Sequence, residues 1–225
     1  MIALLAGARE TQEAAGWLGQ TSASAVVVWA KGAAPVGLGW PVRDAVPRDV
    51  AGILDVTHAF DTGTRAQAVA TAPLAEYARV VRDPWVSGAG DRWTQVVGIE
   101  DAVRALPSGA RVFAATGRAS LPLLGQHDGP VFLRQLSRHD QPTGYPNCQY
   151  VFGAAPFDPE GEADLLKRLA IDVVLARNVG GAGSFPKLAA ARMLGLPVVL
   201  LRPPAVPKGA RVRNARDVGQ WVRGL

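Results

Sequence analysis

A glycine-rich segment late in the chain carries residue types that can hold a flat or anionic ligand. Residues 176–184 follow an apolar run, and Gly180 and Gly181 lie between two cations, Arg177 and Lys187. Glycine lets a ligand approach the backbone closely, and an arginine fork binds carboxylates and phosphates through two parallel hydrogen bonds. We therefore expect this segment to bind substrate. The expected substrate-binding residues are Arg177, Asn178, Gly180, Gly181, Lys187 and Arg202.

A second anion site is predicted where the apolar run 112–115 meets Thr116, Gly117 and Arg118. A threonine hydroxyl, a glycine N–H and an arginine fork together form a cradle for a phosphate or a carboxylate. Thr116 is equally suited to cap the helix that follows, and the two roles are compatible. The sequence leaves open whether this turn holds a cofactor phosphate or a substrate carboxylate.

The segment 55–61, with the sequence DVTHAFD, closes another apolar run. In an open parallel sheet, ligands bind beyond the carboxyl ends of the strands, so Thr57 and His58 are placed to contact a phosphate or a ribose. Histidine also exchanges protons near neutral pH. We therefore predict His58 as a catalytic proton donor, with Asp158 as a second candidate. A purely structural role for His58 is the alternative.

The first strand–helix turn, Gly7–Ala8–Arg9, is where doubly wound folds hold a dinucleotide pyrophosphate against helix N–H groups. It keeps one glycine of the usual three, so a plain tight turn explains it equally well. After the second predicted strand, Lys31 replaces the acid that binds the ribose of NAD, which favours NADPH unless this lysine is only a solvated loop residue. The expected cofactor-binding residues are Gly7, Ala8, Arg9, Lys31, Thr57, His58, Thr116, Gly117 and Arg118.

Alternating strands and helices must position these turns. Continuous runs of Val, Ile and Leu are typical of strands buried on both faces of a parallel sheet. The predicted strands are 2–6, 25–29, 52–56, 77–81, 111–115, 131–133, 172–176 and 197–201, and the predicted helices are 9–18, 62–76, 100–106, 159–169, 186–194 and 215–222. The fold class is therefore α/β, with two Rossmann-like halves, parallel sheets and an inter-domain cleft.

A stretch rich in Pro, Gly, Asp and Trp, residues 83–93, separates two series of strands and helices. We predict an N-terminal Rossmann-like half over residues 1–95 and a C-terminal α/β half over residues 96–225. No sequence repeat relates the two halves.

Composition excludes several classes of protein. Hydrophobic residues make up 48% and charged residues 19% of the chain, which excludes a disordered protein. No apolar run is long enough to cross a membrane, and the first residues lack the basic region and cleavage site of a signal peptide, so we expect a cytoplasmic protein. The single cysteine, Cys148, excludes an internal disulfide and metal sites built from several cysteines.

The net charge of +5 is unevenly distributed along the sequence. Residues 1–95 carry eight basic and nine acidic residues, whereas residues 96–225 carry sixteen and ten. The basic residues are scattered, without the runs and interleaved aromatics typical of nucleic-acid binding, so a small polyanion is the better partner. The alternative explanation is an arginine-rich genome, because arginine outnumbers lysine twenty to four.

Taken in order, these segments resemble the precorrin-6A reductase family. The matching segments are Gly7–Glu10, Asp55–Asp61, Ala115–Arg118, Gly153 with Pro156–Phe157, Arg177–Gly181, and the ending Ala190–Val199 with Arg202–Pro203. The resemblance spans nearly the whole chain, and it rests on the order and spacing of the segments. Two positions depart from the family pattern: Ala8–Arg9 replaces Gly-Thr in the first turn, and Arg177 replaces a lysine.

The resemblance implies an NADPH-dependent oxidoreductase that acts on a CH–CH group and converts precorrin-6A to precorrin-6B in cobalamin biosynthesis. A hydride is transferred to the conjugated tetrapyrrole, and a proton is added at a neighbouring carbon. The implied partner is this small molecule, with no nucleic acid or membrane. A monomer, and handover of product to the next enzyme of the pathway, are compatible with the sequence. The alternatives are a non-catalytic nucleotide-binding module and a sugar-nucleotide group-transfer enzyme.

Overall fold

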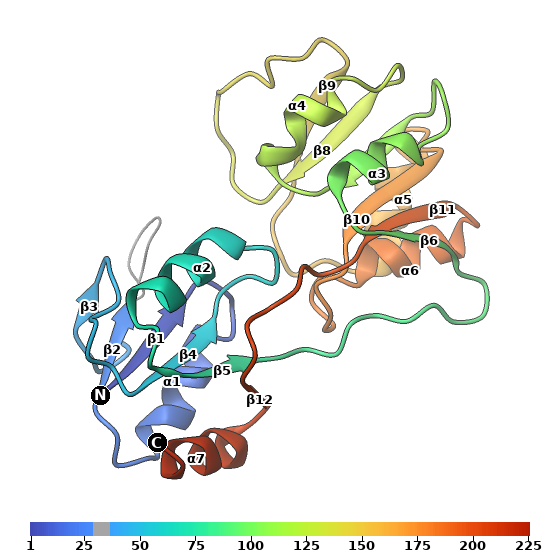
Figure 1. The fold of residues 1–225 in the computed structure, drawn as a ribbon. Helices are drawn as coiled ribbons and strands as arrows, with labels where there is room; N and C mark the ends of the chain where they lie inside the picture. Colours follow the sequence, from blue (N-terminus) through green and yellow to red (C-terminus); the bar gives the residue numbers. More distant parts are fainter. Residues whose placement is uncertain (29–36) are drawn as a thin grey trace. The chain divides into compact units, whose positions relative to one another are not determined.

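The computed structural model describes residues 1–28 and 37–225, and the chain forms two compact units. The first unit contains residues 1–82 and 204–225, and the second contains residues 83–203. Each is built on a six-stranded sheet whose described strand pairs are parallel (Figure 1). The predicted α/β class with parallel sheets is confirmed, and the cleft between the halves stays a prediction.

The first unit has helices on both faces of its sheet. The strands are β1 (Ile2–Ala6), β2 (Ala25–Val28), β3 (Val42–Arg43), β4 (Gly52–Val56), β5 (Glu76–Val80) and β12 (Ala210–Val212), in the order β12-β5-β4-β1-β2-β3. Residues of α1 (Thr11–Gly19) and α7 (Ala215–Arg223) join the hydrophobic core on one face, and residues of α2 (Thr62–Thr71) join the core on the other. Strands β1, β2 and β4 are buried throughout because helices cover both of their faces.

The second unit follows the same plan. Its strands are β6 (Arg92–Val96), β7 (Val112–Ala115), β8 (Val131–Gln135), β9 (Cys148–Phe152), β10 (Val173–Arg177) and β11 (Pro197–Leu201), in the order β6-β11-β10-β7-β8-β9. Helices α5 (Pro159–Arg168) and α6 (Pro186–Met193) pack on one face. Helix α3 (Ile99–Arg104) contacts β6, β11 and α4 (Leu121–Leu124), and a 3-10 turn (Arg118–Ser120) precedes α4.

The eight predicted strands correspond to the inner strands of the two sheets, and the described ends agree within two residues. Trp29, the predicted end of the second strand, lies outside the described residues. The strands that the sequence did not predict are β3, β12, β6 and β9, which form the four sheet edges. Helix α2 was predicted to reach residue 76 but ends at Thr71. Pro73 explains the early end, because a proline disfavours helical geometry in the residue before it.

The boundary between the units differs from the predicted one at residue 95. Strand β6 pairs with β11 in the second unit, so residues 83–95 belong there. Strand β12 pairs with β5, and α7 packs beside α1, so the last 22 residues, 204–225, return to the first unit. Pairing between strands far apart in sequence sets this boundary, and the local pattern at residues 83–93 does not reveal it.

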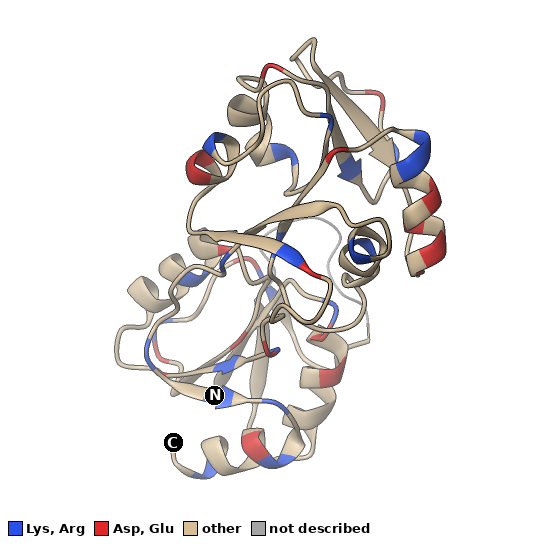
Figure 2. Ribbon diagram, turned by 90° about the vertical axis from the view of Figure 1, so that its right-hand side faces the viewer, with Lys and Arg blue, Asp and Glu red and all other residues tan. Residues whose placement is uncertain are grey.

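The return of the C-terminal segment also corrects the predicted charge asymmetry. The first unit carries twelve basic and eight acidic residues, net +4, and the second carries twelve and eleven, net +1. The excess that the sequence placed in a basic second half therefore belongs to the first unit. Basic and acidic residues are interspersed along both units (Figure 2), so local placement must decide where an anion binds.

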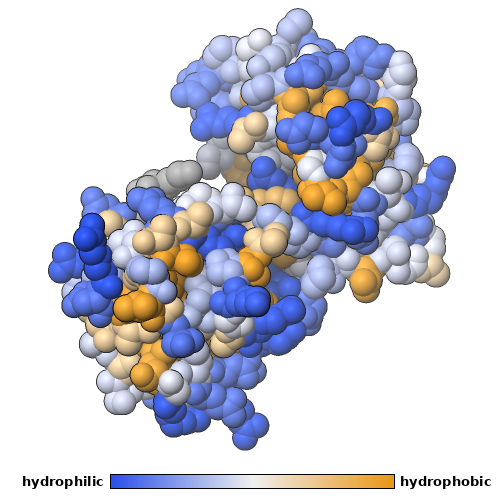
Figure 3. Space-filling view, viewed as in Figure 1, coloured by the Kyte–Doolittle hydropathy of each residue, from blue (hydrophilic) through white to orange (hydrophobic). Residues whose placement is uncertain are grey.

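The surface of each unit is mixed in character. Hydrophobic residues reach it in areas separated by hydrophilic ones in the view of Figure 3. Among the helices of the described residues, none is both long and apolar enough to span a membrane.

Candidate functional site

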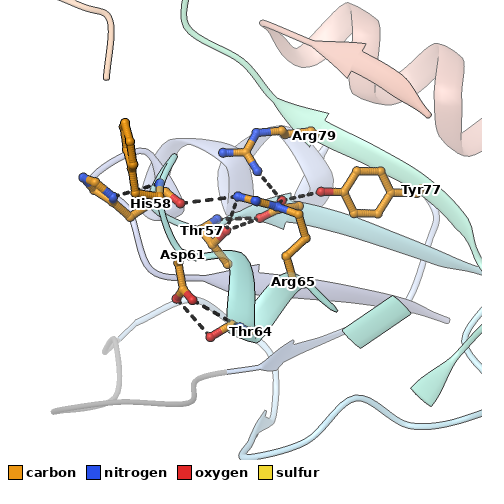
Figure 4. Close-up of polar contacts among 9 residues, drawn as sticks. Thr57, His58, Asp61, Thr64, Arg65, Tyr77 and Arg79 are labelled. Carbon is orange, nitrogen blue, oxygen red and sulfur yellow. Dashed lines mark hydrogen bonds and ion pairs between the residues drawn. The ribbon is translucent and has the colours of Figure 1, made fainter. Parts of the chain in front are cut away.

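A buried carboxylate organises the carboxyl end of β4 in the first unit (Figure 4). Asp55 is fully buried, and its Oδ1 accepts hydrogen bonds from the backbone N–H and the hydroxyl of Thr57, at 2.8 and 2.6 Å. Its Oδ2 accepts from Arg65 Nε at 2.8 Å. The same oxygen accepts from the Tyr77 hydroxyl and from Arg79 Nη1. Donors from the strand end, from α2 and from β5 thus converge on one carboxylate.

The charge of Asp55 is maintained by this environment. Burial alone would raise the pKa of the carboxyl, because it disfavours the charged form. The positive charge of Arg79, together with the hydrogen bonds from the other neighbours, outweighs burial and holds the pKa of Asp55 below its usual value. Burial and the nearby carboxylate raise the pKa of Tyr77, so its hydroxyl remains a donor.

Two guanidinium groups meet this one carboxylate, so the Asp55 cluster carries a net charge of +1. Arg65 is 2% exposed, and its Nη2 donates to Thr57 Oγ1 at 3.3 Å and to the His58 carbonyl at 3.4 Å. Its Nη1 is buried without a hydrogen-bond partner in the described part of the chain. A buried cationic cluster beneath the Thr57–His58 turn favours an anion beyond the strand end.

The first turn lies against this turn. A Cβ at Gly7 would be 3.4 Å from Thr57 Cα, an ordinary van der Waals distance, so the two segments are in contact. The Gly7 N–H donates to Thr11 Oγ1 at 3.2 Å, and the Ala8 N–H donates to the Val56 carbonyl at 2.9 Å. Two N–H groups expected to hold a pyrophosphate are therefore used within the protein.

Other predicted cofactor residues of the first unit are placed differently. The side chain of Arg9 is 60% exposed and pairs with Glu10, which also pairs with Arg82. Lys31 lies outside the described residues. The structure therefore brings together Gly7, Thr57 and His58 but does not place Arg9 among them.

His58 is half-buried and is tied to its own turn. Its Nδ1 accepts a hydrogen bond from the Phe60 N–H at 3.2 Å. With Nδ1 as acceptor, the neutral ring carries its proton on Nε2. Asp61 begins α2 by accepting from the Thr64 N–H at 3.1 Å and from the Thr64 hydroxyl at 2.9 Å.

In the second unit, the Thr116–Gly117 turn lies beside Arg177. Thr116 is buried, and its hydroxyl is hydrogen-bonded to Ser120 Oγ at 2.7 Å. The capping role suggested for Thr116 is wrong, because the N-cap of the turn that follows is Gly117, without a side-chain cap hydrogen bond. Gly117 has a φ of +81°, and a Cβ there would be 3.5 Å from Arg177 Nη1. Arg118 instead donates to Gln141 at 2.6 Å on the surface. Arg177 from β10, rather than Arg118, thus lies against the glycine.

Asn178 has a structural partner. It is 3% exposed, and its side-chain amide accepts from the Trp85 N–H at 2.8 Å and donates to the Trp85 carbonyl at 2.9 Å. The Trp85 indole donates to the Gly181 carbonyl at 2.8 Å. Gly180 and Gly181 have φ values of +68° and +71°, a region that favours glycine. Asn178 therefore holds the segment around Trp85 against the glycine-rich loop, so its amide is occupied.

Lys187 is a half-buried cation of the second unit. Its Nζ donates to the Ser184 carbonyl and lies 5.9 Å from the centroid of the Trp85 ring. Burial lowers the pKa of Lys187 to about 8, with Glu162 opposing the shift and Arg134 adding to it. Glu162 and Arg134 form a buried ion pair with each other. An amine of this kind can pair with a ligand carboxylate at neutral pH.

The remaining predicted residues lie at the surface. Asp158 caps α5 by accepting from the Gly161 N–H at 2.7 Å, so its side chain has a structural role. Arg202 follows β11 and donates to Gln95 at 3.2 Å. Of the predicted substrate residues, the structure therefore places Arg177, Lys187 and the glycine loop near the carboxyl ends of the inner strands.

Comparison with known proteins gives the family. The model of the family described as precorrin-6x reductase CbiJ/CobK matches residues 44–223. The chain belongs to the precorrin-6x reductase family. A precorrin-6A reductase of Rhodobacter capsulatus is 35% identical over 243 residues, which cover 100% of this chain and 93% of that relative. One from a Sinorhizobium species is 33% identical and covers 77% of this chain and 70% of the relative.

A solved structure described as CobK precorrin-6A reductase agrees with this assignment. It is 32% identical, has a TM-score of 0.79 and covers 99% of this chain and 96% of that chain. The sequence likeness to the Rhodobacter capsulatus protein and the likeness in fold to this CobK structure therefore both extend over nearly the whole chain.

In this member of the family, sequence reasoning missed the partners of Asp55 and the aromatic residues beside the glycine loop. An aspartate within the apolar run GILDV and an arginine within the predicted strand 77–81 are out of place unless they pair. That signal identifies Asp55 and Arg79. Arg65, Trp85 and Phe185 give no comparable signal, because their contacts depend on segments distant in sequence.

Proposed function

We propose that this protein reduces precorrin-6A to precorrin-6B in cobalamin biosynthesis, with NADPH as hydride donor. The observation that carries the proposal is the likeness to the Rhodobacter capsulatus precorrin-6A reductase, which extends over the whole chain. NADPH, when bound, supplies the hydride, and the protein supplies position, charge and a proton.

In this proposal, the first unit binds NADPH. Its Thr57–His58 turn follows a central strand, where doubly wound sheets bind nucleotides. The Asp55 cluster beneath the turn is cationic, which suits a phosphate, and the turn at Gly7 lies in contact with the Thr57–His58 turn. Thr57 and His58 would contact the cofactor, with Arg65 holding both in place.

In this proposal, the second unit binds the tetrapyrrole. Its net charge gives no support for this placement, so the argument rests on two local cations. Arg177 lies beside Gly117, and Lys187 lies over Trp85. A conjugated ring with carboxylate side chains needs a glycine backbone that it can approach closely. It also needs cations for its carboxylates, either an arginine guanidinium or a lysine ammonium group.

His58 remains the proposed proton donor. Its Nδ1 accepts from the backbone, so the neutral ring carries its proton on Nε2, and histidine exchanges protons near neutral pH. The cap role of Asp158 makes that residue the weaker candidate.

The preference for NADPH over NADH is expected to be measurable. No acid follows β2 in the sequence, and Lys31 follows it instead. Fluorescence titration should give tighter binding of NADPH, and Lys31→Ala should weaken it by about 1–3 kcal/mol through loss of a charge-assisted hydrogen bond. Equal affinities for the two cofactors would contradict this cofactor assignment.

Replacement of His58 should lower turnover more than stability. His58→Ala removes partly buried side-chain hydrogen bonding, and each such bond contributes about 0.5–1.5 kcal/mol to the unfolding free energy. Loss of a general acid should lower kcat roughly a hundredfold or more. His58→Asn is the control, because asparagine can accept the same backbone N–H while supplying no comparable proton. Normal turnover in both variants would leave His58 a purely structural role.

The proposed function is tested by oxidation of NADPH in the presence of precorrin-6A, followed at the nicotinamide absorbance, with product identified by mass. A non-catalytic nucleotide-binding module would bind NADPH without oxidising it. A sugar-nucleotide transferase would neither oxidise NADPH nor reduce precorrin-6A. Either result would refute the proposal.

A further inference from the structure

An apolar groove of about 350 Å³ lies on the second unit where α5 and α6 begin. Its lining residues are Trp85, Pro159, Gly181, Ala182, Phe185 and Pro186. All of these side chains are apolar or absent. The groove lies at the carboxyl edge of the sheet, because Gly181 and Ala182 follow β10 and both helices start there.

The aromatic residues of the groove are fixed in position. The rings of Trp85 and Phe185 meet edge to face, with centroids 5.8 Å apart and planes at 63°. Asn178 holds the backbone of Trp85 on both its N–H and its carbonyl, and Gly181 holds the indole N–H. Groups already locked in place lose little entropy when a ligand binds, so this surface is preorganised.

Cations lie beside both rings. Lys187 Nζ lies 5.9 Å from the centroid of Trp85, and Arg192 Cζ lies 5.8 Å from the centroid of Phe185. Arg192 is paired with Asp91. Glu162, the carboxylate whose charge acts on Lys187, is already paired with Arg134. Of these two cations, Lys187 is therefore the one that can form an ion pair with a ligand carboxylate. An apolar floor with a cation beside one of its aromatic rings complements a flat ring that carries carboxylates at its periphery.

We propose that the Trp85–Phe185 groove seats an apolar edge of the tetrapyrrole macrocycle, with a carboxylate side chain of the ring on Lys187. Ligand pockets span about 300–1,000 Å³, so this groove holds one side of the macrocycle and not the whole. The proposal rests on the proposed function for the identity of the ring. It names the residues that bind the ring and places them where α5 and α6 begin.

The test places a negative charge in the groove without touching its aromatic residues. Ala182 lines the groove and is exposed, so Ala182→Glu and Ala182→Trp should leave folding intact. Ala105, exposed at the C-cap of α3 and away from the groove residues, provides the matched control Ala105→Glu. The dissociation constant of precorrin-6A is measured by absorbance titration without NADPH, and that of NADPH by fluorescence.

Ala182→Glu should weaken precorrin-6A binding by about tenfold or more, because a carboxylate would face both the ring carboxylates and an apolar surface. Ala182→Trp, which fills the groove, should weaken it similarly. NADPH binding and the melting temperature should match those of Ala105→Glu. Unchanged precorrin-6A affinity in both Ala182 variants would overturn the proposal. So would a change of oligomeric mass with unchanged affinity, because it would assign the groove to a second copy of the chain.

Failure of the groove and failure of the function give different results. If only the groove is wrong, the wild type and the Ala182 variants reduce precorrin-6A alike. If the function is wrong, the wild type does not oxidise NADPH with precorrin-6A, while the titration still decides whether the groove binds the ring.

Discussion

Asp55→Asn is expected to lower the free energy of unfolding of the first unit by about 3–5 kcal/mol, because it leaves two buried guanidinium groups without their carboxylate. Arg65 and Arg79 are 2% and 8% exposed, so water cannot replace the lost partner. The Tyr77 hydroxyl and the Thr57 hydroxyl would also lose a charged acceptor. Denaturant unfolding followed by circular dichroism measures the loss.

The pH dependence of this effect follows from the lowered pKa of Asp55. A carboxyl whose folded pKa is below its unfolded value contributes stability that is fully present above the unfolded value, 3.8, and lost as pH falls through the folded value. The difference between wild type and Asp55→Asn should thus be constant at neutral and mildly acidic pH. It should shrink only below about pH 4.

Asp61→Asn is the matched control, because it makes the same chemical change six residues away. Asp61 only caps α2, and asparagine caps a helix as well as aspartate does, so the cost should be within about 0.5 kcal/mol. Equal stability losses at both positions would show that the Asp55 cluster has no special role. An additional loss of NADPH affinity in Asp55→Asn, measured where the variant is folded, would support its role beneath the Thr57–His58 turn.

Arg177→Gln is expected to raise the Michaelis constant for precorrin-6A about tenfold to a hundredfold, since hydrogen bonds to charged groups contribute roughly 1.5–3 kcal/mol. Arg177 ends β10 and lies against Gly117, at the edge of the sheet where ligands bind. Burial lowers the pKa of its guanidinium, but arginine remains charged at neutral pH. NADPH binding should stay nearly unchanged.

The control for Arg177→Gln is Arg168→Gln, which removes the same charge from the exposed C-terminal end of α5. Wild-type affinity for the tetrapyrrole should also fall as salt rises, because charge pairs at the surface are screened within about 10 Å at 0.1 M salt. Loss of NADPH binding with intact tetrapyrrole binding would mean that the two ligands occupy the opposite units.

The sequence by itself predicted the inner strands of this protein. Runs such as IALLA and PVVLL are continuous because both faces of those strands are covered by helices, so burial is recorded in local composition. The edges β3, β12, β6 and β9 were missed for the complementary reason. An edge strand such as β6, RWTQV, is largely exposed, and its place depends on backbone pairing with a distant strand.

The candidate site divides in the same way. Its turns were predicted because Thr57–His58, Thr116–Gly117 and the segment from Arg177 to Gly181 follow apolar runs, and a turn after a parallel strand lies at the edge where ligands bind. The order of these motifs also sufficed to recognise the family, which the comparisons confirm.

Only the tertiary structure decided which side chains meet. It joined Asp55 to Arg65 and Arg79, set Arg177 rather than Arg118 beside Gly117, and fixed Trp85 above the glycine loop. It also returned residues 204–225 to the first unit and with them the excess positive charge. The physical reason is common to all four: each depends on contacts between segments far apart in sequence, which no local pattern of residues encodes.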